Sequence, residues 1–388
     1  MPSPEKKTVL DLPLKVILTD EGTTVFIRQN KKLTKFKLAD NAEEHGLLLE
    51  RFVPSSIQRM LLIDYVSKIE IARAEFVSCR QEVMDLSKLV VFGILYRQFD
   101  ATLFTRIMAS DVIKRWNRSN PASILDEKTR FNEGFLQSYF RERSDVMAQI
   151  KQELLVPIRK KIMRNGELLP DELNTQLLLS EKFIDSLRGA TWFILSKFHD
   201  VEGYEFIAKE LMSLLSVYME KAKIAEYVAL NVIELAVNAE NTNLRREAAF
   251  LYRGTEDPNA VLYDPGIRRR VVDELRKKDE LVYIAWKIGG TSSSIGTQGR
   301  LQITLYNQED EYQLVKDNID AKKAANLRKK SLLDFYREIP PGEADTELGL
   351  YYLSYLSEAC EKVGIKFESA VSQIKSSDTT VITLSFNI

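Results

Sequence analysis

The chain has 388 residues, of which 45% are hydrophobic and 29% charged, and this composition is that of a globular protein with two or three domains. Fifty-five basic residues balance 56 acidic ones, which excludes a strong overall attraction to nucleic acid or to an anionic membrane. The two cysteines are too few for a disulfide framework or a zinc site of several thiolates. We expect a cytoplasmic protein, because we find neither a signal-peptide pattern nor a run of about 20 apolar residues.

Alternating apolar residues near the N-terminus predict a small β-meander within residues 1–50. Residues 14–18 alternate between apolar and polar side chains, and residues 24–27 and 33–38 resume an extended pattern. Three short strands bury little apolar surface alone, so we expect them to pack against another element or a partner.

Residues 51–220 have the pattern of a helical region. Ser55 and Ser56 provide a helix cap, and the apolar residues that follow at helical spacing are Ile57, Met60, Leu61, Tyr65 and Ile69. Further along, Pro157 predicts a kink or break in a helix of mixed charge. Because helical bundles of this length commonly supply dimerisation or partner surfaces, we expect protein partners and allow for a homodimer through this region.

The pattern changes again in residues 221–388, where helices and strands follow one another. Residues 281–305 predict a β-hairpin with a long tip, and a charged helical stretch follows over residues 311–337. Another helix is expected over residues 348–363, and two closing strands over residues 365–388. The predicted fold class is therefore α+β, with an N-terminal meander, a central helical bundle and a C-terminal two-layer α/β sandwich.

The helix predicted over residues 223–244 carries a polar stripe on an otherwise apolar surface. The apolar surface indicates that most sides of this helix are buried. Four polar residues fall within about 80° of one another on the helix, namely Asn231, Glu234, Asn238 and Asn241. An unpaired buried carboxylate or amide costs on the order of a few kcal/mol, so the stripe must face water, a polar partner, or a cation and its ligand. A solvated face is the alternative, although no Lys or Arg lies between Ala225 and Leu244.

Three sequence segments resemble one known superfamily. Residues 234–239 read Glu-Leu-Ala-Val-Asn-Ala and resemble the N-box of the histidine kinase/gyrase/chaperone (GHKL) ATPases. Residues 348–350, Leu-Gly-Leu, are similar to the end of that family's second glycine box. Residues 378–384 resemble its penultimate strand with a threonine, here Thr380.

The resemblance implies a sandwich of the histidine-kinase-ATPase type over residues 221–388, with Mg-ATP or ADP as the cofactor. It implies Glu234 as the catalytic residue that supports a water, and Asn238 as the magnesium ligand. The nucleotide-binding residues that it implies are Asn231, Asn238, Asn241, Gly349 and Thr380.

Two glycine boxes of that family are altered in this chain. Residues 306–312, where the family carries an Asp-x-Gly-x-Gly box that reads adenine, contain no glycine. Asp345 and Glu347 replace the leading glycines of the second box, and their carboxylates would repel phosphate. We therefore predict a regulatory or signalling protein with a degenerate ATP-binding domain, which acts through protein partners with little or no ATPase or kinase activity.

The sequence leaves two other functions open. The chain is an active ATP-dependent kinase of histidine or serine if Asn238 binds magnesium and Glu234 assists. It is a helical scaffold without a nucleotide site if the stripe is only a solvated face. His199 lies in a His-Asp-x-x-Gly pattern similar to a kinase phosphoacceptor box, but too close to Asn238 for a second dimerisation helix, so we expect an ordinary loop residue. The basic residues 268–278 are expected to be a solvated face, and we do not expect nucleic-acid binding.

Overall fold

The structure is a computed structural model that describes residues 9–129, 131–164, 170–289, 299–308, 316–317, 353, 355–375 and 377–388. The chain forms two compact units. The sheet unit consists of Met1–Ile94 and Lys223–Ile388, and the helical unit consists of Leu95–Ala222. The two ends of the chain thus share one unit, whereas the sequence pattern placed residues 1–50 and 221–388 in separate domains.

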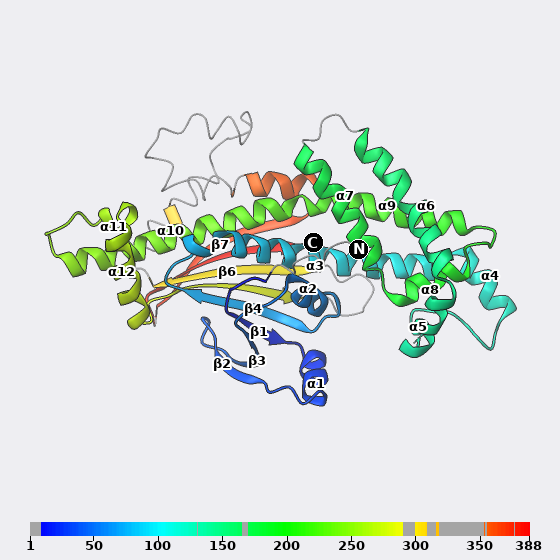
Figure 1. Ribbon diagram of the computed structural model, residues 1–388, viewed down its shortest axis with the longest axis horizontal. Coiled ribbons are helices and arrows are strands. Elements are labelled where there is room, and N and C mark those ends of the chain that lie inside the picture. Colours follow the sequence, from blue (N-terminus) through cyan, green and yellow to red (C-terminus); the bar gives the residue numbers. More distant parts are fainter. Residues whose placement is uncertain are drawn as a thin grey trace, which may run out of the picture. The chain divides into compact units, whose positions relative to one another are not determined.

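The described strands form one antiparallel sheet of eight strands (Figure 1). Their order across the sheet is β2-β3-β1-β4-β5-β6-β8-β7. The bounds are β1 Leu14–Leu18, β2 Thr34–Lys37, β3 Glu43–Leu49, β4 Val66–Arg73, β5 Val282–Gly289, β6 Arg300–Gln308, β7 Lys366–Ile374 and β8 Thr379–Asn387. The pairing of β4 with β5 joins the N-terminal strands to the C-terminal ones, from Lys68 opposite Lys287 to Arg73 opposite Val282.

The C-terminal hairpins lie where the alternating patterns predict them. β5 pairs with β6, and β7 pairs with β8. On the inner strands β5, β6 and β8 one row of side chains is buried, including Ile284 and Trp286 of β5 and Phe386 of β8, whereas the edge strand β7 has no buried side chain. Alternation of this kind is typical of a sheet with one face on the core. The predicted hairpin tip at residues 290–298 and most of the charged stretch over residues 311–337 lie outside the described residues.

The strand predicted over residues 24–27 is wrong. These residues belong to helix α1 (Asp20–Arg28). Thr19 caps this helix, because its side chain accepts a hydrogen bond from the backbone N–H of Gly22. Two acidic residues in the first turn also favour a helix start there. The third strand of the N-terminal group is β3 instead.

The single helix predicted from Ile57 to Ile69 is also wrong. Helix α2 (Pro54–Leu62) ends before Asp64, which adopts a positive φ of 61°. Ile69 then lies in β4. The spacing of apolar residues over so short a run fits both a helix and a strand, and the turn at Asp64 separates the two elements.

Helix α10 (Ile224–Tyr252) contacts β5 and β6, and Figure 1 shows it lying over the sheet. Helices α11 (Ala260–Tyr263) and α12 (Pro265–Lys277) pack against it. Within the helix predicted over residues 348–363, the described residues 355–362 are helical. A helical layer on an antiparallel sheet confirms the α+β class.

The helical unit is entered through α3 (Arg80–Met108), which begins in the sheet unit. The other helices are α4 Asp111–Ser119, α5 Glu133–Glu142, α6 Ser144–Met163, α7 Pro170–Asp185, α8 Gly189–Lys197 and α9 Tyr204–Ala222. Pro157 lies inside α6, which continues past it rather than breaking. No helix in the described part of the chain is both long and apolar enough to cross a lipid bilayer.

Candidate functional site

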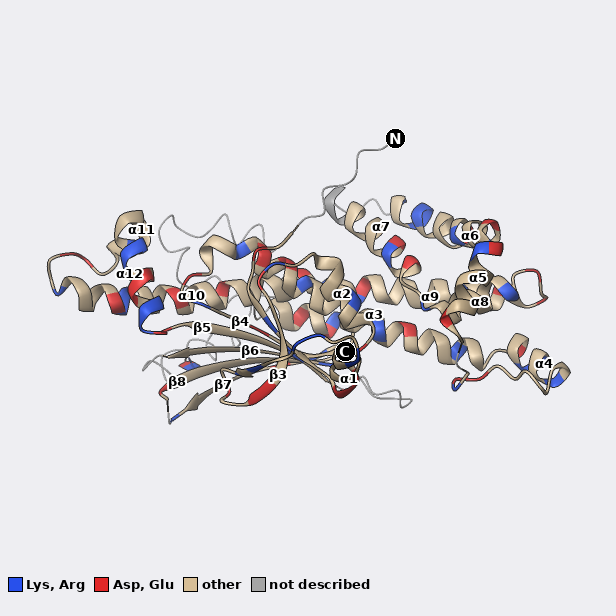
Figure 2. Ribbon diagram, turned by 60° about the horizontal axis from the view of Figure 1, so that its bottom comes forward, with Lys and Arg blue, Asp and Glu red and all other residues tan. Residues whose placement is uncertain are grey.

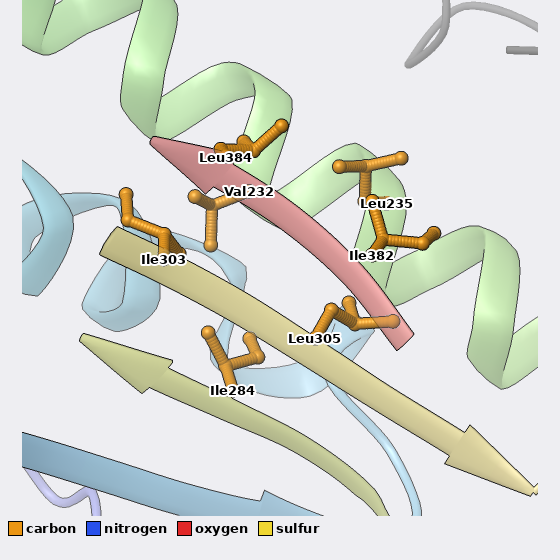
Figure 3. Close-up of a pocket in the computed structure, with 7 residues that line it drawn as sticks. All are labelled: Val232, Leu235, Ile284, Ile303, Leu305, Ile382 and Leu384. Carbon is orange, nitrogen blue, oxygen red and sulfur yellow. The ribbon is translucent and has the colours of Figure 1, made fainter. Parts of the chain in front are cut away.

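The apolar side of α10 packs on the sheet. Val232 and Leu235 extend from α10 towards β5, β6 and β8, as Figure 3 shows. The strand residues around them are Ile284, Ile303, Leu305, Ile382 and Leu384. These seven side chains line a cavity of about 10 Å³, and because all are aliphatic they offer a ligand no polar group. The cavity is therefore a packing void, and the polar stripe lies on another side of the helix.

Asn231 and Glu234, the first two residues of the stripe, have partners inside the protein. Asn231 is fully buried, and its side-chain amide donates a hydrogen bond of 2.8 Å to the carbonyl oxygen of Tyr227. The Glu234 carboxylate forms an ion pair with the guanidinium of Arg80 at the start of α3. Only 12% of the Glu234 side chain is exposed. Neither residue therefore lies on a solvated face.

Asn238 and Asn241 complete the stripe. Asn241 is 9% exposed and Asn238 is half-buried. The backbone carbonyl of Asn238 accepts a hydrogen bond of 3.2 Å from the Thr242 hydroxyl, one turn further along the helix. Gly349 lies outside the described residues. In the part of the chain that is described, no group of three or more His, Cys, Asp or Glu side chains forms a metal site.

Thr380 belongs to a second, buried polar group. It lies on β8 directly opposite Asn307 of β6, and the two residues are 1% and 2% exposed. Asn243 of α10 donates a hydrogen bond of 2.7 Å from its side-chain amide to Asn307 Oδ1. The link between helix and strands thus runs through two residues outside the stripe. Neither residue was predicted from the sequence, although each interrupts a row of apolar side chains at helical or strand spacing.

Asn243→Leu is expected to lower the free energy of unfolding by about 1–3 kcal/mol, because the hydrogen bond to the buried Asn307 Oδ1 is lost. The double variant with Asn307→Leu should lose less than the sum of the two single changes, since both single changes remove the same hydrogen bond. Urea unfolding of the four proteins measures this coupling. Strictly additive losses would show that the two side chains do not interact.

A fully buried carboxylate, Glu240, lies elsewhere on α10. One of its oxygens accepts hydrogen bonds from the backbone N–H groups of Phe76 and Val77. The other pairs with Arg268 of α12, whose Nε also lies 2.9 Å from Glu75. Burial raises the pKa of Glu240 to about 7, although the backbone hydrogen bonds and the Arg268 charge act in the opposite direction. This cluster ties the β4–α3 connection and α12 to α10.

His199 is held between two carboxylates of the helical unit. Its Nε2 lies 3.0 Å from Glu153 and its Nδ1 lies 3.1 Å from Asp200. Burial acts to lower the pKa of His199, and the two carboxylates outweigh burial and raise the pKa above its usual value. Because both ring nitrogens are engaged, the imidazole is not poised to accept a phosphoryl group.

Helix α12 carries charges of both signs, as Figure 2 shows, and its acidic residues Asp273 and Glu274 lie between two groups of basic residues. Arg276 pairs with Asp273 at 3.3 Å, and Lys277 pairs with Glu274 at 2.6 Å. Pairs of this kind neutralise charge locally in the last turns of α12.

Comparison with known proteins finds similarity along the whole chain. An uncharacterized protein of Treponema pallidum (strain Nichols) is 42% identical over 387 residues, which cover 100% of both chains. The similarity therefore includes the sheet unit and the helical unit. No solved structure matches the chain. The family described as "Family of unknown function (DUF8084)" matches residues 5–388, and the chain belongs to this family.

Proposed function

We propose that this protein is a regulatory protein whose C-terminal half is a degenerate ATPase-type sandwich of the GHKL kind, and that it acts through protein partners. The layer of α10 on an antiparallel sheet supports this proposal. So does the order of the elements that follow, which are the β5–β6 hairpin, the helical residues 355–362 and the β7–β8 hairpin. The observation that best supports a domain without ATPase activity is the ion pair between Glu234 and Arg80.

A catalytic carboxylate must be free to orient a water and to take a proton from it. The Glu234 carboxylate instead contacts the Arg80 guanidinium, and its side chain is only 12% exposed. A glutamate engaged in this way serves to hold α10 to α3. The arrangement fits a protein that retains the layer architecture without hydrolysing ATP.

The residues of the stripe fit a magnesium-nucleotide poorly. Mg²⁺ is held by oxygen ligands that usually include one or two carboxylates. Glu234 is engaged by Arg80, and the Asn231 side chain bonds to its own helix. Asn238 is more accessible, but its amide is neutral, so the site adds no carboxylate to the phosphates of the nucleotide as a ligand for Mg²⁺. We therefore assign no step of a reaction to a bound nucleotide.

Calorimetric titration with magnesium-ATP and magnesium-ADP tests this proposal. We expect no binding at micromolar concentrations and no phosphoryl transfer from labelled ATP to the protein. An active kinase instead requires micromolar binding that Asn238→Ala abolishes. Asn259→Ala, at an exposed asparagine of the sheet unit, is the control and should leave such binding intact. Turnover of ATP that depends on both Asn238 and Glu234 would overturn the proposal.

A further inference from the structure

Lys197, the last residue of α8, is a partly buried cation held by aromatic rings. Its Nζ lies 4.2 Å from the centroid of the Trp116 ring and 5.6 Å from that of the Phe193 ring. Such contacts hold an ammonium group in place, but they do not neutralise its charge. Among the described residues, no carboxylate forms an ion pair with Lys197.

Arg143 is a second cation beside the first, in the connection between α5 and α6. Its guanidinium lies 5.1 Å from the centroid of the Tyr139 ring, and it donates a hydrogen bond of 3.1 Å to the carbonyl oxygen of Ser196. Burial lowers the pKa of Lys197, and the nearby Arg143 charge lowers it further. Within the described ranges no carboxylate pairs with Arg143 either, so the repulsion between the two cations is not relieved.

Several other cations of the helical unit have such partners. Carboxylates pair with Arg106, Lys151, Arg159, Arg188 and His199. Glu153 and Asp200 of the same unit are engaged by His199. Unlike these five side chains, Lys197 and Arg143 lie beside each other without a carboxylate partner among the described residues, so the pair is a local excess of positive charge.

An aromatic surface adjoins the two cations. The Phe193 ring, which contacts Lys197, lies 4.9 Å from the Tyr139 ring and 5.8 Å from the Phe135 ring, measured between centroids. Phe135 of α5 is 49% exposed. Exposed aromatic side chains beside cations are typical of protein interfaces, where aromatic residues and arginine are enriched.

We propose that Lys197 and Arg143, together with the exposed Phe135, form a docking site for a peptide segment of a partner protein that carries a carboxylate next to an apolar side chain. The guanidinium and the ammonium supply hydrogen-bond donors for the carboxylate, and the aromatic surface covers the apolar neighbour. The aromatic part favours a peptide over inorganic phosphate, which has nothing to bury there. This inference rests on the proposed action through partners, but on residues that the ATP titration does not involve.

Selection from a displayed library of random peptides tests the site on the full chain. Peptides enriched on the wild-type protein are expected to carry Asp or Glu beside an aromatic or large aliphatic residue. Their affinity should fall at least about tenfold for the double variant Lys197→Met and Arg143→Met. Methionine keeps the apolar stems, so the ring contacts are largely retained. Lys160→Met with Lys209→Met, two exposed lysines of the same unit, is the matched control and should bind as the wild type does.

A second measurement changes only the peptide, so it does not depend on how well a variant folds. Replacing Asp and Glu of an enriched peptide by Asn and Gln should remove its binding to the wild-type protein. The proposal is overturned if no acidic peptide is enriched, or if the double variant binds as tightly as the control. It is equally overturned if inorganic phosphate or phosphatidylserine vesicles bind through these two cations while peptides do not. Each of these failures leaves the result of the ATP titration unchanged.

Discussion

Replacing Arg268 by methionine is expected to lower the free energy of unfolding by about 3 kcal/mol or more at pH 8, and by clearly less at pH 5. Glu240 is fully buried, and its carboxylate pairs with the Arg268 guanidinium. Without this cation, the ionised carboxylate keeps the hydrogen bonds from the backbone N–H groups of Phe76 and Val77 but has lost its ion pair with Arg268 inside the protein. Methionine preserves the length of the apolar stem, so the change tests the charge rather than the packing.

The pH dependence follows from the direction of the shift at Glu240. Burial raises its pKa from 4.5 to about 7 in the folded protein, while the unfolded chain keeps the ordinary value. Between pH 4.5 and about 7, the folded protein therefore binds more protons than the unfolded chain. The stability that protonated Glu240 contributes is fully present below the unfolded pKa, and it is lost as the pH rises through the folded pKa. At pH 5 the carboxyl group is largely neutral and needs no cation, whereas at pH 8 it is ionised. Glu240→Gln should accordingly remove part of the fall in stability between these two pH values.

Urea unfolding followed by the fluorescence of Trp286 isolates the sheet unit. Trp286 is fully buried in β5. The other two of the three tryptophans, Trp116 and Trp192, lie in the helical unit and are changed to phenylalanine in every protein compared. Arg269→Met, at the exposed neighbouring position of α12, is the matched control and should change stability by less than about 0.5 kcal/mol. A loss that is the same at both pH values would contradict an ion pair at Glu240.

The strands of the C-terminal hairpins could be predicted because apolar and polar residues alternate along them. The strand that joins the two ends of the chain could not. In β4, Lys68 is 5% exposed and Glu70 is fully buried, so charged residues stand on a row that a simple pattern assigns to solvent. Their partners are Asp40, 28 residues away, and Lys15, 55 residues away. Burial of charge by such distant partners leaves no local signal in the sequence.

The polar stripe of α10 could be found from the sequence, because amides and a carboxylate at helical spacing are conspicuous on an apolar helix. The partner of Glu234 could not be found in this way, since Arg80 is 154 residues away along the chain. The same holds for the backbone donor from Phe76 to Glu240, which is 164 residues away. Periodicity shows on which side of a helix a residue lies, but not which element covers that side. The ion pair of Glu234 with Arg80 is therefore visible only in the tertiary structure.

Leu235→Ala is expected to lower the free energy of unfolding of the sheet unit by about 2–5 kcal/mol. Leu235 is 4% exposed and packs against strands β5, β6 and β8. The cavity of about 10 Å³ beside it is lined by aliphatic side chains. Water gains no hydrogen bonds in such a space, so the volume left by the truncated side chain stays empty. We therefore expect a loss in the upper part of the range.

Leu251→Ala is the matched control, because the residue type and the helix are the same while Leu251 is 39% exposed. This change is expected to cost less than about 1 kcal/mol, and the same titration with Trp286 as the reporter measures both variants. The comparison bears on function as well as on stability, since the resemblance to GHKL ATPases depends on a helix that packs over an antiparallel sheet. Equal losses at the two leucines would mean that α10 does not pack there, and the proposed ATPase-type sandwich would lose its basis.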